Sequence, residues 1–137
     1  MSEDYYPTMP THAVVPHYYG DAVRILFVAA AVVILFGEFF DATFPLPLGL
    51  ALIIIAALVV IAGITNPVQI WIQWVNVVSS FVGLALFGDI ALVEVHMRMP
   101  FAQSIYPGLV TLIFLASLYF GTRTLRGLMI HRSAIME

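Results

Sequence analysis

Four long apolar stretches occupy most of this chain, and nearly every charged residue lies at or beyond their ends. Each stretch is close to the ~20 residues that an α-helix needs to cross a hydrocarbon core of ~30 Å. We therefore expect four transmembrane helices, over residues 22–40, 46–65, 68–93 and 105–126. Hydrophobic residues make up 62% of the chain and charged residues 9%, against ~25% charged residues in soluble domains.

The connections between the expected helices are short, so sequential helices should lie antiparallel. The predicted fold is an all-α membrane protein in which two antiparallel hairpins form one bundle of four transmembrane helices. It divides the chain into a Pro- and Tyr-rich N-terminal tail over residues 1–20, a transmembrane domain over residues 21–132 and a C-terminal tail over residues 133–137. The prolines of the N-terminal tail predict an irregular backbone there.

The few arginines predict the orientation in the membrane. Arg24 opens the first helix, and Arg123, Arg126 and Arg132 follow the fourth. Four crossings place both termini on one side, and the positive-inside rule makes that side the cytoplasm. The Asn66–Pro67 pair then predicts a tight cytoplasmic turn before the third helix.

Some of these residues are also expected to contact lipid headgroups. Arginine side chains can extend to the interface and attract anionic lipid, and tryptophan is enriched at the same depth. This lipid-interface group consists of Arg123, Arg126, Arg132, Trp71 and Trp74.

A polar stripe follows the third expected helix, because its members recur at steps of four and three residues and so share one face. The stripe consists of Gln69, Gln73, Asn76, Ser80 and Gly83. Amides that faced hydrocarbon would lack hydrogen-bond partners, so the stripe should face protein or water. We interpret it as a helix-packing surface, held by hydrogen bonds and by close approach at the glycine. The other interpretation is one wall of a polar pathway.

Acidic residues end the first and third expected helices on the side away from the termini. They are Glu38, Asp41, Asp89 and Glu94. If the two helix ends meet, these carboxylates form a candidate ion or proton site. Asp89 lies about one turn deeper than Glu94 and on a different face, so these two are not expected to share a site. The simpler interpretation is that the carboxylates are hydrated among the headgroups.

Common catalytic motifs are missing from the chain. It has no His-Glu-x-x-His, no Gly-x-Ser-x-Gly, no phosphate-binding glycine loop and no dinucleotide fingerprint. Its four histidines are scattered, which gives no pair for haem or metal at membrane depth. No basic cluster indicates nucleic-acid binding. We therefore expect a protein that is not an enzyme and that binds no cofactor, metal or nucleic acid.

Two functions fit the sequence. The first is a non-catalytic structural or accessory subunit of a membrane assembly. Its partners would be membrane lipids and other transmembrane helices, in a hetero-complex or a homo-oligomer. Small residues favour this function, because they let membrane helices approach closely. Gly49, Ala56 and Gly63 share one face of the second helix in this way.

The alternative is a small oligomeric ion- or proton-coupled transporter or channel. Its path would use Asn76, Ser80, Asp89 and Glu94. The two functions differ in whether the polar stripe is dry and packed against a helix, or faces water.

Overall fold

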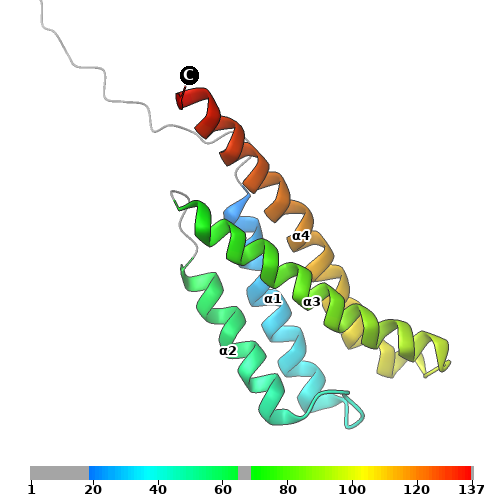
Figure 1. Ribbon diagram of the computed structural model, residues 1–137. Coiled ribbons are helices and arrows are strands. Elements are labelled where there is room, and N and C mark those ends of the chain that lie inside the picture. Colours follow the sequence, from blue (N-terminus) through cyan, green and yellow to red (C-terminus); the bar gives the residue numbers. More distant parts are fainter. Residues whose placement is uncertain (1–18, 65–68, 137) are drawn as a thin grey trace, which may run out of the picture.

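The computed structural model describes residues 19–64 and 69–136, and every regular element in this part of the chain is an α-helix. The helices are α1 (Gly20–Phe40), α2 (Leu48–Ile64), α3 (Ile70–His96) and α4 (Phe101–Met136) (Figure 1). Of these described helices, α1, α3 and α4 are long and apolar enough to cross a membrane, which indicates an integral membrane protein. The 17-residue α2 is apolar throughout but shorter. The predicted N-terminal tail up to residue 18, the predicted turn at 65–68 and residue 137 lie outside the described residues.

Prolines and caps explain where the helices begin. α2 begins at Leu48 instead of residue 46, because the residue before Pro47 is sterically kept out of helical conformation. α3 begins at Ile70 because Gln69 has extended backbone angles. The carbonyl of Pro100 accepts hydrogen bonds from the N–H groups of Gln103 and Ser104, which starts α4 four residues before the predicted position.

α4 is much longer than its apolar stretch. The sequence predicts a helix over residues 105–126 and a separate tail from residue 133, whereas α4 spans Phe101–Met136. At ~1.5 Å per residue its 36 residues measure ~54 Å, well above the ~30 Å hydrocarbon core. α4 is therefore longer than a crossing of the hydrocarbon core requires, and its arginine-bearing end continues as helix beyond the apolar stretch.

The four helices form two antiparallel hairpins, α1–α2 and α3–α4, joined through α1 and α4 (Figure 1). α4 packs along α3 on one side and against α1 on the other, while α2 packs against α1. The helices α2 and α3 barely meet. The bundle is therefore open on the side between α2 and α3. The start of α1 and the end of α4 lie at the same end of the molecule.

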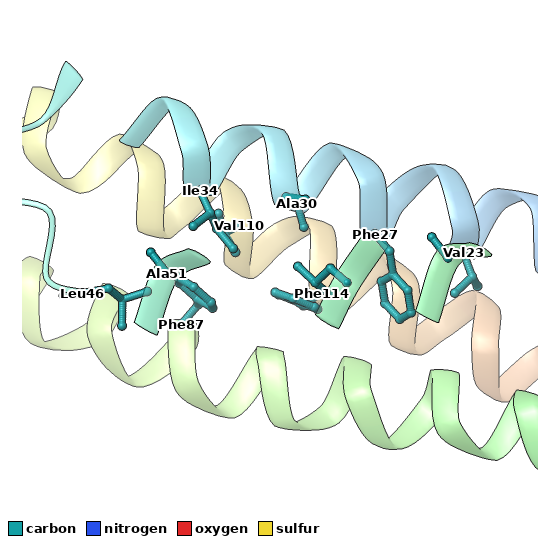
Figure 2. Packing of buried hydrophobic residues seen from close by; sticks show 12 residues of the cluster. Val23, Phe27, Ala30, Ile34, Leu46, Ala51, Phe87, Val110 and Phe114 are labelled. Atoms are coloured by element: carbon teal, nitrogen blue, oxygen red, sulfur yellow. The ribbon is translucent and has the colours of Figure 1, made fainter. Parts of the chain in front are cut away.

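The core follows one seam along each of three helices. The buried residues of α1 recur at steps of three and four, as do those of α4 from Pro107 to Thr124, and this spacing keeps one face of each helix turned inward. Phe114 of α4 lies at the centre, with its ring centroid 6.3 Å from that of Phe27 on α1 and 5.9 Å from that of Phe87 on α3 (Figure 2). Three aromatic rings thus join the two hairpins.

Candidate functional site

Most of the polar stripe of α3 lies in the interface with α4. Gln73, Asn76 and Ser80 are fully buried, and Gly83 is buried on the same face. A Cβ atom placed on Gly83 would lie 2.5 Å from Cε1 of Phe114. The helices thus approach so closely here that only a hydrogen fits on this Cα atom.

Two glycine contacts fix the antiparallel register of α3 and α4. Gly83 faces Phe114, and Gly121 of α4 faces Val77, whose Cγ2 would lie 3.2 Å from an added Cβ. Continuing this register along both helices sets two hydroxyls opposite each other, an amide opposite a glycine, and an amide opposite a hydroxyl. The pairs are Ser80 with Ser117, Asn76 with Gly121 and Gln73 with Thr124. All six residues are buried.

The hydrogen bonds of this polar interface run mainly along each helix. Asn76 Nδ2 donates to Gln73 Oε1 at 3.4 Å, and Ser80 Oγ donates to the carbonyl of Asn76 at 2.8 Å. Three fully enclosed atoms of this interface have no partner among the described residues: Gln73 Nε2, Asn76 Oδ1 and Ser117 Oγ. The described part of the interface thus holds amides and hydroxyls but no charged group. It can hold two helices in register.

Gln69 lies apart from this interface. It is exposed immediately before α3, where its Oε1 accepts a hydrogen bond from Trp71 Nε1 at 3.1 Å. The buried part of the stripe therefore begins at Gln73.

The structure brings some of the predicted acidic residues together and leaves one apart. Glu38, Asp41 and Glu94 are half-buried, and the carboxylates of Asp41 and Glu94 are close enough to repel each other. Asp41 Oδ1 also accepts hydrogen bonds from the backbone N–H and the hydroxyl of Thr43 at 2.9 and 2.6 Å, which forms the turn after α1. One carboxylate oxygen of Glu38 and one of Glu94 are enclosed without a partner among the described residues.

Asp89 is exposed on α3 and is not part of this group. Within the described residues, no three histidine or acidic side chains are close enough to hold a metal ion. Of the four candidate residues, the structure therefore brings Asp41 and Glu94 close to each other, while Asp89 points to the exposed surface of α3.

The lipid-interface residues lie on the outer surface at the end of the bundle where α1 begins and α4 ends. Trp71, Trp74, Arg123, Arg126 and Arg132 are all exposed. Arg123 is the most constrained of them: its Nη1 donates to the Tyr119 hydroxyl at 3.1 Å, and its Cζ lies 5.4 Å from the centroid of the Tyr19 ring.

The sequence did not predict the roles of Tyr19 and Thr124, which join the start of α1 to α4. Thr124 is fully buried, and its hydroxyl accepts a hydrogen bond from the backbone N–H of Tyr19 at 2.9 Å while donating to the carbonyl of Phe120. The available signal was the spacing of Gly121, Thr124 and Leu128, which continues the buried face of α4 beyond its apolar stretch.

Comparison of the chain with protein-family models, with curated proteins and with solved structures finds no match.

Proposed function

We propose that this protein is a non-catalytic structural or accessory subunit of a membrane assembly, with four transmembrane helices and both termini in the cytoplasm. The observation that carries the proposal is the open side of the bundle. A groove of about 240 Å³ runs between α2 and α3 and is lined mainly by aliphatic side chains, among them Ile54, Leu58, Val82 and Leu86. It lies halfway along both helices, where a transmembrane helix of a partner can pack.

The outer face of α2 extends this docking surface. Gly49, Ile53, Ala56, Val60 and Gly63 recur at steps of four and three and are all exposed. The same spacing forms the buried seams of α1, α3 and α4 inside the chain. In the described structure no helix covers this face of α2. Its small residues suit contact with a partner helix better than contact with lipid, because they permit close backbone approach.

The burial of the polar residues also favours a subunit over the transporter alternative. A path for ions needs polar groups that face water along one route. Asn76 and Ser80 lie inside the interface of α3 and α4, Asp89 is exposed elsewhere on α3, and Glu94 lies near Asp41 at the helix end. Within one chain these four residues do not line a common route.

The number of crossings depends on α2. Its 17 residues measure ~26 Å as a helix and lie at the lower limit of the ~17–25 residues found in membrane-spanning helices. The helix contains no charged residue, and its residues are on average more apolar than those of the other three helices. We propose that α2 crosses the bilayer, which places the α1–α2 connection on the side away from the termini.

The first test is purification of the tagged full chain in a mild detergent, followed by mass analysis of the intact particle. We expect other membrane proteins to co-purify in a fixed stoichiometry. Recovery of this chain alone, or of copies of this chain only, would contradict the hetero-assembly.

Gly63→Leu tests the docking surface itself. A Cβ added at Gly63 meets no heavy atom within 4 Å in the described part of the chain, so the fold of the subunit should tolerate the change. We expect partner association to weaken about tenfold, because overpacking an interface costs ~1–3 kcal/mol. Gly108→Leu is the matched control, since a Cβ there is equally free of contacts and Gly108 lies on α4. Equal partner recovery from both variants would count against α2 as the docking helix.

A further inference from the structure

α4 leaves the hydrocarbon core at Arg123. Residues 101–122 contain no charged side chain, and at ~1.5 Å per residue they measure ~33 Å, close to the ~30 Å thickness of the core. Arg123 and Arg126 follow this run immediately, and both are exposed. Their guanidinium groups therefore lie at the depth of the lipid headgroups.

The two arginines line a surface hollow of about 390 Å³ together with Tyr119 and Thr122. The guanidinium of Arg123 is held from two directions, by a hydrogen bond to the Tyr119 hydroxyl and by the ring of Tyr19. Tyr19 is itself fixed, because its backbone N–H binds the buried hydroxyl of Thr124 (2.9 Å) and its ring packs 5.2 Å from that of Phe120. Tyr19, at the start of α1, thus holds the guanidinium of Arg123 on α4 in place.

The hollow is lined by hydrogen-bond donors and, in the described part of the chain, by no negatively charged side chain. Within the described residues, neither Arg123 nor Arg126 forms an ion pair with a carboxylate. The Thr122 hydroxyl already donates to the carbonyls of Leu118 and Tyr119, so the two arginines and the Tyr119 O–H are the donors left for a ligand. Each guanidinium presents five N–H groups in a planar fork that matches the oxygens of a phosphate.

Apolar surface continues from the hollow into the membrane. Leu115 and Leu112 lie one and two turns before Tyr119 on the same face of α4, and both are exposed. An acyl chain attached to a bound headgroup can lie along these side chains. A free phosphate ion would make no use of them.

We propose that Tyr19, Tyr119, Arg123 and Arg126 form a binding site for the phosphate group of an anionic phospholipid, in the leaflet on the side of the termini. The inference rests on the membrane position of α4 and is independent of the proposed partner assembly. The headgroup of an anionic phospholipid has a phosphate diester and no positive charge, so it can bind both guanidinium groups. The choline of a zwitterionic lipid carries a positive charge, which the two arginines would repel.

The test is native mass spectrometry of the full chain in a neutral detergent, titrated with dioleoyl phosphatidylglycerol or dioleoyl phosphatidylcholine. We expect phosphatidylglycerol to bind at least about tenfold more tightly than phosphatidylcholine. Arg123→Gln should weaken phosphatidylglycerol binding at least about fivefold, the value expected for one interfacial arginine. Arg24→Gln is the matched control, because Arg24 is exposed at the same end but does not line the hollow, and it should change binding less than about twofold.

A second variant separates an ordered site from diffuse charge attraction. Tyr119→Phe keeps every charge and removes only the hydroxyl that holds Arg123, and we expect it to weaken phosphatidylglycerol binding about threefold, as the loss of one hydrogen bond predicts. The proposal is overturned if Arg24→Gln and Arg123→Gln weaken binding equally, or if both lipids bind alike. Displacement of phosphatidylglycerol by a tenfold excess of inorganic phosphate would show that the site takes the free ion and not the lipid.

Discussion

At the scale of single residues, the closest approach of the two hairpin partners α3 and α4 depends on the missing side chain of Gly83. Phe114 occupies that space, and its ring also packs against Phe27 and Phe87. In hydrocarbon, helices associate through van der Waals packing and hydrogen bonds without help from the hydrophobic effect. Disrupting the contact between Gly83 and Phe114 should therefore lower the free energy of unfolding directly.

Gly83→Ala tests this contact. The added methyl group would lie 2.5–2.6 Å from three atoms of the fully buried Phe114 ring, and we expect the free energy of unfolding to fall by about 1–3 kcal/mol. Thermal unfolding in detergent micelles, followed by tryptophan fluorescence, measures the change.

Gly88→Ala is the control on the same helix. There the nearest atom is Thr111 Cγ2 at 3.8 Å, an ordinary contact, and alanine is favoured over glycine inside a helix by about 0.5–1 kcal/mol. This variant should be as stable as the native chain or slightly more stable. If both variants lost the same stability, close packing at Gly83 would not be the cause.

At the scale of elements, the end of α3 shows how the chain reverses direction between two long helices. The N–H of Arg98 binds the carbonyl of Val95, and the N–H of Met99 binds the carbonyl of Glu94, which together form a Schellman motif. Arg98 takes the left-handed position of this motif with φ 52°, a position that glycine fills in most such helix ends. The strain of a side chain there is offset by the hydrogen bonds that close the helix.

Arg98→Gly should relieve this strain. A left-handed backbone conformation costs an L-residue about 1–2 kcal/mol, and the greater entropy of glycine in the unfolded chain offsets about 0.5–1 kcal/mol of that gain. We expect a net stabilisation of about 0.5–1 kcal/mol in the same unfolding assay.

Met97→Gly is the opposite control. Met97 has φ −75° and is exposed, so glycine there adds flexibility without relieving strain and should destabilise the protein by about 0.5–1 kcal/mol. A destabilised Arg98→Gly variant would mean that the arginine side chain itself stabilises the connection.

At the scale of the whole molecule, the described charges separate into two ends. Four of the five arginines lie at the end where α1 begins and α4 ends, and Asp21 is the described acidic residue there. The opposite end carries the four acidic residues of the candidate site, together with His96 and Arg98. Such an asymmetry is what the positive-inside rule associates with a fixed orientation. It supports the proposal that both termini are cytoplasmic.

Single cysteine variants can test this topology, because the native chain contains no cysteine. Ala42, Gln69 and Ser133 are exposed positions in the α1–α2 connection, before α3 and near the end of α4. With a membrane-impermeant maleimide on sealed vesicles, we expect cysteines at 69 and 133 to react from the cytoplasmic side and a cysteine at 42 to react from the other. If α2 does not cross the bilayer, positions 42 and 69 will react from the same side.

Much of the local structure could be predicted from the sequence, because a membrane helix must satisfy its backbone hydrogen bonds internally and present apolar side chains to lipid. The apolar stretches predict the helices, and the steps of three and four residues place Gln73, Asn76, Ser80 and Gly83 on one face of α3, which the structure turns toward α4. Helix ends were less predictable, because α4 continues as a helix well beyond its apolar stretch.

The arrangement of the helices was decided by the tertiary structure alone. All four helices carry a face of small residues, and nothing in their periodicity states that α1, α3 and α4 use theirs within the chain while α2 leaves Gly49 and Gly63 uncovered. The packing of α1 against α4 likewise sets the ring of Tyr19 beside Arg123, across about a hundred residues of sequence. Residence in a membrane can therefore be read from each apolar stretch separately, because lipid selects apolar side chains on every helix. The sites depend on how the two hairpins pack against each other, which is a property of the whole chain.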